Sequence, residues 1–162
     1  MRPVRRPLLL AVLALGAAVL AGCSGTASAQ LQAGERTVYL TAIEPKGSTT
    51  VDKEPFPEAS LPPGGGYGLK APDDAGTWTV ETYVWLPSEI TVVEGDNVTL
   101  QVLAVNGAIH PTRIEGYDVT FEAKRGQLTT VTFTADKPGI FKIVCSAHQP
   151  TMTGTLIVLP KG

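Results

Sequence analysis

Four side chains in the C-terminal half of the sequence share an affinity for soft metal ions. His110 stands alone after an expected strand, whereas Cys145, His148 and Met152 follow one another within eight residues. Apart from the initiator methionine and one N-terminal cysteine, these four are all the histidine, cysteine and methionine of the chain. Such scarce residue types would rarely cluster by chance, so their spacing predicts a single metal site.

The chemistry of this set points to copper. A thiolate and a thioether are soft ligands that suit Cu(I), and imidazoles also suit Cu(II). The alternation of Phe141, Ile143 and Cys145 places the thiol on a core-facing side of a strand, where the strand gives way to a loop. His148 and Met152 can then turn back toward it. Two imidazoles and a thiolate with a weak axial thioether form the ligand set of an electron-transfer copper site.

Each of these residues also has an ordinary structural interpretation when taken alone. A single cysteine is usually a small buried hydrophobe, a methionine fills gaps in a core, and a histidine can be a hydrogen-bonded loop residue. Their joint occurrence with the spacing Cys-x2-His-x3-Met favours metal binding. Burial at the base of a loop would also keep an unpaired thiol away from oxidants.

The N-terminus predicts export. Basic residues from Arg2 to Arg6 precede an apolar run over residues 8–20, which is too short to span a membrane comfortably. The boundary Leu20-Ala21-Gly22-Cys23 resembles a bacterial lipobox, in which the cysteine becomes the lipidated first residue. We therefore expect a signal peptide at residues 1–22 and an extracytoplasmic, lipid-anchored protein, periplasmic or on the outer face of the cell membrane. An uncleaved membrane helix, a plain signal peptide and a twin-arginine route are the alternatives.

Composition bounds the mature part of the chain. Residues 23–36 form the lipidated cysteine and a flexible tether of small and polar residues. The export segment holds three of the 13 basic residues, so ten remain against 15 acidic residues, a net charge of about −5. Nucleic acid is therefore a poor partner, and a cationic protein is a better one. With Cys23 assigned to the anchor, a single cysteine is left and no internal disulfide can form.

The elements that must position the four side chains are strands. The chain has 17 Gly and 13 Pro with 6% aromatic residues, which favours short strands joined by tight turns. Residues 44–76 are rich in proline and glycine and predict a long irregular insertion, since the triple glycine at 64–66 lacks the context of a phosphate loop. Period-two alternation and turn residues predict strands at 37–43, 78–86, 89–93, 97–105, 118–123, 128–135, 140–145 and 153–159. These elements predict one all-β domain over residues 37–162, a two-sheet sandwich or a barrel.

The stretch from about residue 85 to residue 159 resembles the cupredoxins, the blue type 1 copper proteins. His110 matches the early histidine of that family, and Cys145, His148 and Met152 match the ligands of its last long loop. Asn106 stands where many members have an asparagine ahead of the first histidine. The resemblance implies a Greek-key β-sandwich of about seven to eight strands that binds one copper ion.

Within the family, the flanking sequence is similar to nitrosocyanin and to the copper domains of cytochrome c oxidase subunit II and nitrous oxide reductase. Binuclear domains have a second cysteine four residues after the first, where this chain has Gln149. Nitrosocyanin-like red sites have a glutamate at the position of His110 and a histidine at that of Met152. The resemblance therefore implies a mononuclear blue site.

The expected function is that of a membrane-tethered one-electron carrier, and not of an enzyme. By resemblance, His148 is the electron port, within an apolar patch for which Pro111, Ala147 and Pro150 are candidates. Redox proteins such as a membrane oxidase or a cytochrome are the expected partners of a monomer. A copper carrier or assembly protein for a respiratory oxidase is the alternative, and a metal-free adhesion or scaffold module is a third.

Overall fold

A computed structural model describes residues 30–162, which contain twelve β-strands and no helix. The predicted signal peptide, Cys23 and the first part of the tether lie outside the described residues. Within the described part, no helix is long and apolar enough to cross a membrane. The strands are β1 Glu35–Ile43, β2 Lys46–Thr50, β3 Tyr67–Lys70, β4 Thr77–Thr82, β5 Val84–Leu86, β6 Glu89–Val93, β7 Asn97–Ala104, β8 Ile109–Ile114, β9 Val119–Lys124, β10 Leu128–Thr134, β11 Gly139–Cys145 and β12 Thr153–Leu159.

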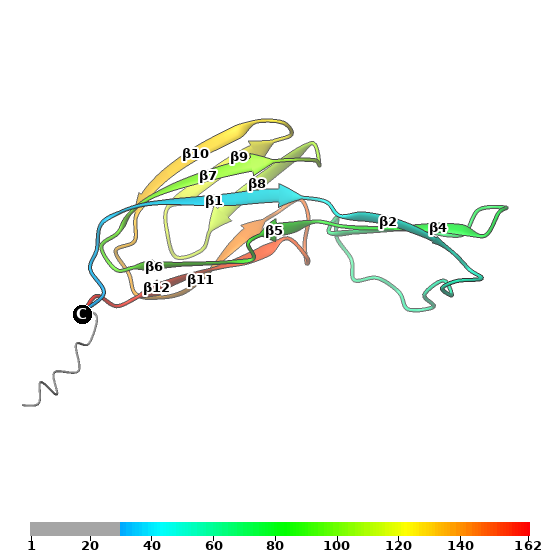
Figure 1. Cartoon of the computed structure of the whole chain (residues 1–162), viewed down its shortest axis with the longest axis horizontal. Helices are drawn as coiled ribbons and strands as arrows, with labels where there is room; N and C mark the ends of the chain where they lie inside the picture. Colours follow the sequence, from blue (N-terminus) through cyan, green and yellow to red (C-terminus); the bar gives the residue numbers. More distant parts are fainter. Residues whose placement is uncertain (1–29) are drawn as a thin grey trace, which may run out of the picture.

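Nine strands form two sheets packed face to face (Figure 1). One sheet has the order β10-β7-β1-β5 and the other β6-β12-β11-β8-β9. The pairs β1/β7 and β6/β12 are parallel, and the remaining pairs are antiparallel. Successive connections from β5 to β8 pass from one sheet to the other. The predicted all-β sandwich is confirmed.

The alternation seen in the sequence becomes the core between the sheets. On β7, Val98, Leu100, Val102 and Ala104 are buried, while the residues between them are not. Apolar residues of the facing sheet, among them Ile143, close the core from the other side. Each fully buried aliphatic side chain contributes about 1.5–3 kcal/mol, so the two sheets provide a rigid support for the loops at their ends.

The strand count differs from the expected seven to eight in part because the sequence pattern does not reveal β8. Pro111 cannot donate a hydrogen bond to a sheet and therefore favours a loop at this position. In the structure, the carbonyl oxygen of Pro111 accepts a hydrogen bond from the Ser146 amide at 2.9 Å, so the missing donor does no harm. The second residue of β8 is His110.

The sequence predicted that the insertion at residues 44–76 is irregular. This prediction is wrong in part, because the insertion contains the strands β2 and β3. β2 and β3 pair with the two edges of β4 in a separate three-stranded sheet, here called the arm, which extends beyond one end of the sandwich (Figure 1). The sequences of β2 and β3 are polar or contain glycine and show no period-two alternation. They form strands because their backbones pair with β4, so they do not need an apolar face that packs against a core. The ring of Trp78 packs edge-on against Phe56 at 5.7 Å and forms a small core of the arm.

The start of β1 is fastened to the sandwich by one buried carboxylate. Asp96 is completely buried and accepts hydrogen bonds from the amides of Val93 (2.7 Å) and Gly34 (2.8 Å) and from the Arg36 guanidinium (2.5 Å). Ordered backbone therefore begins before residue 37, where the tether was expected to end. The Gly162 amide donates to the Leu31 carbonyl at 3.2 Å, so both ends of the described chain meet at the end of the sandwich opposite the arm (Figure 1).

Candidate metal centre

The four predicted ligands come together at the arm end of the sandwich. Nitrogen atoms of His110 and His148 and the Cys145 sulfur all lie within 4.8 Å of one another. The Cys145 Sγ is 3.3 Å from His148 Nδ1, and the Met152 Sδ is 3.2 Å from His110 Nδ1. Two imidazole nitrogens, a thiol and a thioether therefore converge on one small volume.

Three elements supply these side chains. β8 carries His110, the end of β11 carries Cys145, and the connection to β12, here called the ligand loop (residues 146–152), carries His148 and Met152. The side chains of His110, Cys145 and Met152 are completely buried, whereas His148 is partly exposed. The antiparallel pairing of β8 with β11 sets Thr112 opposite Cys145 and thereby brings the first histidine beside the thiol.

One hydrogen bond fixes the protonation of the His110 ring. Its Nε2 lies 2.9 Å from the carbonyl oxygen of Asn106, which can only accept, so Nε2 carries the proton. Nδ1 is thus left with a free lone pair aimed at the cluster, as a metal-bound histidine requires. Gly107 lies against the ring with a φ of +75°, and a Cβ there would lie 2.7 Å from the ring carbon Cε1. No larger residue fits this turn without displacing the ring.

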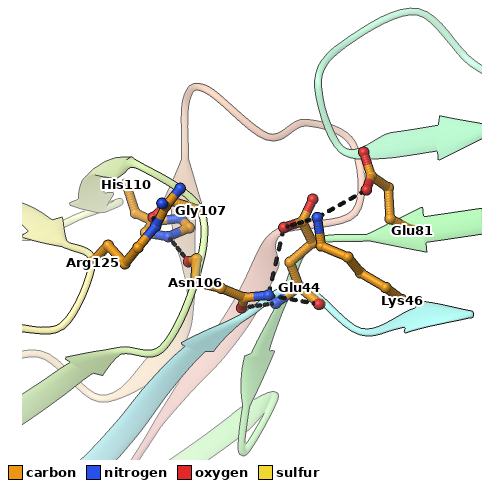
Figure 2. Close-up of polar contacts among 7 residues, drawn as sticks. All are labelled: Glu44, Lys46, Glu81, Asn106, Gly107, His110 and Arg125. Carbon is orange, nitrogen blue, oxygen red and sulfur yellow. Dashed lines mark hydrogen bonds and ion pairs between the residues drawn. The ribbon is translucent and has the colours of Figure 1, made fainter.

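The side chain of Asn106 ties this turn to the end of β1 (Figure 2). Its Oδ1 accepts from the Glu44 amide at 2.7 Å, and its Nδ2 donates to the Glu44 carbonyl at 2.9 Å. The Glu44 carboxylate pairs in turn with Lys46 at 2.9 Å, and Lys46 also reaches Glu81 on the arm at 3.0 Å. A continuous chain of polar contacts therefore connects His110 to the arm.

The ligand loop is held from within by Gln149. Its amide nitrogen donates to the carbonyl oxygens of Cys145 (2.7 Å) and Met152 (3.2 Å), and its Oε1 accepts from the Thr153 hydroxyl at 3.1 Å. The Met152 amide donates to the His148 carbonyl at 2.9 Å and closes the loop. The residue that replaces the second cysteine of binuclear domains thus organises the loop.

Burial sets the protonation of the ligands before any metal binds. Burial lowers the pKa of His110 and of His148, against opposing effects that include the charge of Glu44. Both imidazoles are therefore neutral near pH 7 and can act as ligands. Burial raises the pKa of the Cys145 thiol, although backbone hydrogen bonds from Ala147 and His148 oppose it. A metal ion that binds here must displace the thiol proton, so binding weakens as the pH falls.

The donor set fits copper. Neutral imidazoles suit Cu(II), sulfur ligands suit Cu(I), and the hydrogen bond from His110 Nε2 to the Asn106 carbonyl leaves Nδ1 free to bind a metal.

The apolar patch expected around His148 is exposed in part. Of its three candidate residues, Ala147 and Pro150 are exposed and Pro111 is partly buried.

Sequence reasoning missed three contributors to the site. Glu44 and Tyr83 lie in segments assigned to the insertion and to a strand interior, and neither has a motif that marks it. The Tyr83 ring stacks on His148 with centroids 3.8 Å apart, and burial and a hydrogen bond with Glu44 raise its pKa to about 12. The triple glycine did carry a signal, since three successive glycines suggest close backbone approach. The sequence did not indicate which segment of the chain these glycines approach.

The chain belongs to the family of cupredoxin-like domains. The model of that family matches residues 61–158, which is more than half of the chain. Members of the family bind copper, and this chain has a candidate His-Cys-His site for it. The resemblance inferred from His110 and the loop ligands is thereby confirmed at the level of the family.

Known relatives cover only part of the chain. It is 30% identical over 77 residues to cytochrome c oxidase subunit 2 from Thermus thermophilus, covering 44% of this chain and 56% of that protein. The subunit 2 of a further strain of the same species is also 30% identical over 77 residues, with 45% of its length covered. The chain therefore spans about half the length of these relatives.

Two solved copper proteins align with most of the described chain. The multicopper oxidase mgLAC aligns with a TM-score of 0.51 and 20% identity, covering 79% of this chain and 40% of that one. A copper nitrite reductase from Nitrosomonas europaea aligns with a TM-score of 0.47 and 22% identity, covering 78% and 42%. At this identity the likeness to mgLAC shows a shared fold alone.

Replacing Met152 with leucine tests whether Met152 is a ligand. Leucine is close in volume, so we expect the free energy of unfolding of the metal-free protein to change by less than about 1.5 kcal/mol. Copper affinity should fall by less than about tenfold, because a thioether would be the weakest ligand of the set. The reduction potential should rise, because Cu(I) is satisfied by the thiolate and two imidazoles alone, whereas the more highly charged Cu(II) loses more when a further donor is removed. Redox titration of both forms checks this, and an unchanged potential would remove Met152 from the ligand set.

Proposed function

We propose that this protein is a mononuclear type 1 copper protein that carries single electrons outside the cytoplasm while tethered to a membrane by a lipid on Cys23. The observation that supports it best is the convergence of two imidazoles, a thiol and a thioether at one end of a rigid sandwich. Copper bound there would alternate between Cu(I) and Cu(II) and so supply one-electron redox chemistry.

The residues around the site favour small structural change during that chemistry. The Asn106 carbonyl holds the His110 ring in one orientation, and the Gln149 amide holds both ends of the ligand loop. Cys145 and Met152 are packed in the core. Side chains that are fixed in this way resist rearrangement when the charge of a bound ion changes, which favours fast electron exchange.

Electron transfer is proposed in preference to substrate turnover. His110, Cys145 and Met152 are completely buried, so a substrate could not reach them. Only His148 among the four is partly exposed, with Ala147 and Pro150 exposed beside it. Electrons would therefore pass through the edge of the His148 ring, as the resemblance to blue copper proteins implies.

The direction of the site suits a tethered carrier. The described chain begins at the end of the sandwich opposite the arm (Figure 1), whereas the ligand loop is hydrogen-bonded to Gly66 at the base of the arm. A lipid on Cys23 would leave the metal end turned away from the membrane. The excess of acidic residues in the mature part favours a cationic face on the partner, which we propose to be a membrane oxidase or a cytochrome.

Copper titration of the purified full chain in detergent tests this function. We expect one equivalent of Cu(II) to produce an intense visible thiolate-to-copper band and a single paramagnetic-resonance signal. Both should vanish on reduction and return on reoxidation without loss of metal. The measurement is absorption and paramagnetic resonance through several redox cycles.

Three other outcomes would contradict the proposal in different ways. Copper that binds without the visible band, or leaves on reduction, would favour a carrier or assembly protein for an oxidase. Two equivalents with a coupled signal would contradict a mononuclear site. Failure to bind copper would favour a scaffold module.

A further inference from the structure

The triple glycine of the insertion lies directly against the ligand loop. A Cβ on Gly65 would collide with the carbonyl oxygen of Ala147, and a Cβ on Gly64 with that of Gln149. A Cβ on Gly66 would lie 2.8 Å from the carbonyl oxygen of His148. Real side chains do not approach backbone oxygens so closely, so this segment, here called the glycine strap (residues 64–66), needs all three glycines to reach the loop.

Hydrogen bonds fasten the glycine strap on both sides. The Gly66 amide donates to the Gln149 carbonyl at 3.0 Å, and the Thr151 hydroxyl donates to the Gly66 carbonyl at 2.8 Å. The same Gly66 carbonyl accepts from the Tyr83 amide at 2.9 Å. The strap thus bridges the ligand loop and the base of the arm.

The arm also restrains the ring of a ligand. Tyr83 follows β4 directly, and its ring stacks on His148 with an interplanar angle of 17°. The backbone of the ligand loop and the ring of its histidine are therefore both held by residues that directly flank the strands of the arm. Neither contact involves a residue of the sandwich strands.

We propose that the glycine strap and Tyr83 are positioning elements, which hold the ligand loop in its ligating arrangement before metal binds. This inference gives the insertion a role at the site, and its copper-dependent part rests on the proposed function. Without the strap, the backbone of residues 147–151 would lose its outer wall, and His148 and Met152 would sample other positions. Cys145, at the base of the loop, would then become accessible.

The decisive variant is Gly65→Ala. Gly65 has no positive φ, so alanine causes no backbone strain, and its added Cβ would collide with the backbone carbonyl oxygen of Ala147. In the metal-free full chain, the Cys145 thiol should react with an aromatic disulfide reagent about tenfold faster than in the wild type. That corresponds to about 1.4 kcal/mol in the local opening equilibrium. Cys23 is replaced by serine in every protein, so that the reagent reports on Cys145 alone.

Two further variants keep this test specific. Gly47→Ala lies in the same arm on β2, where a Cβ meets the Val80 side chain at an ordinary 3.9 Å, so its thiol rate should stay within about twofold of wild type. Thr151→Val removes the hydroxyl bonded to Gly66 without a collision, and its rate should rise about threefold. Urea unfolding of each variant separates local opening from a general loss of stability.

The copper-loaded forms provide a second measurement. The visible band and the paramagnetic-resonance parameters should shift in Gly65→Ala and remain unchanged in Gly47→Ala. Equal thiol rates in wild type and Gly65→Ala, or equal increases in both glycine variants, would overturn the proposal. If Gly65→Ala does not fold, the rate of the Cys145 thiol reaction in Thr151→Val tests the proposal instead, and a rate equal to that of the wild type would overturn it. If the thiol of Gly65→Ala reacts faster but the wild-type protein binds no copper, the proposed function is contradicted while the inference about the glycine strap is supported.

Discussion

Replacing Cys145 with serine should abolish the intense visible band and weaken Cu(II) binding by at least about a hundredfold. The thiolate is the strongest soft donor of the set, and removing even an outer partner of a metal ligand commonly costs about 10–100-fold in affinity. The hydroxyl would also be buried at a fully enclosed position, which should lower the free energy of unfolding of the metal-free protein by about 1–3 kcal/mol. Competitive copper titration and urea unfolding measure the two effects.

The neighbouring Ser146→Ala variant is a matched control. Ser146 is exposed, and its hydroxyl makes a long contact of 3.4 Å with the Pro111 carbonyl, to which its backbone amide also donates at 2.9 Å. Alanine keeps that amide, so band and affinity should match the wild type. Retention of both in Cys145→Ser would show that the copper site lies elsewhere.

Replacing Asp96 with asparagine should lower the free energy of unfolding by about 2–4 kcal/mol at pH 7. The carboxylate is completely buried, and Arg36 and the amides of Val93 and Gly34 all donate to it. An asparagine presents one oxygen in place of two and no charge to Arg36, so at least one buried donor loses its partner. Urea unfolding at constant salt measures the change.

The effect of Asp96 also has a definite pH dependence. Burial alone would raise the pKa of this carboxyl, but the hydrogen bonds from Arg36, Val93 and Gly34 outweigh it and leave the pKa below its usual range. A lowered pKa in the folded state means that the stabilisation is complete above the unfolded pKa of about 4 and is lost as the pH falls below it. The difference between wild type and variant should therefore narrow as the pH falls below about 4.

Glu115→Gln is the comparison for an exposed carboxylate. Glu115 pairs with Arg113 at 2.7 Å, but the two side chains are 40% and 53% exposed, so solvent screens the pair. Its removal should leave the free energy of unfolding nearly unchanged. If Asp96→Asn behaves in the same way, the buried carboxylate does not fasten the start of β1.

Much of the sandwich could be predicted because its strands alternate. Val98, Leu100 and Val102 are buried as their spacing requires, since side chains at period two share one face of a strand. Strands without that pattern were missed. The polar β2 and β3 are held by backbone pairing with β4. β8 was not predicted because Pro111 argues against a strand, although its carbonyl oxygen accepts a hydrogen bond from the Ser146 amide.

The residues of the metal centre were predicted because their types are rare in this chain. Cys145, His148 and Met152 are close in sequence, and His110 was linked to them by chemistry and by resemblance. The structure brings all four together, and the pairing of β8 with β11 places His110 beside Cys145. The anchor at Cys23 stays a prediction, because it lies outside the described residues.

The sequence by itself determined which residues could form the candidate site and that the fold has two layers of strands, since both depend on residue types and local periodicity. Tertiary structure decided what holds the site in place. Asn106 is 62 residues from Glu44, and Gly66 is 85 residues from Thr151, yet each pair is in direct hydrogen-bonded contact. Contacts across such separations depend on how sheets and loops pack, which no local pattern encodes. The glycine-rich insertion, predicted from the sequence to be an irregular loop, packs in the folded protein against the backbone of the ligand loop.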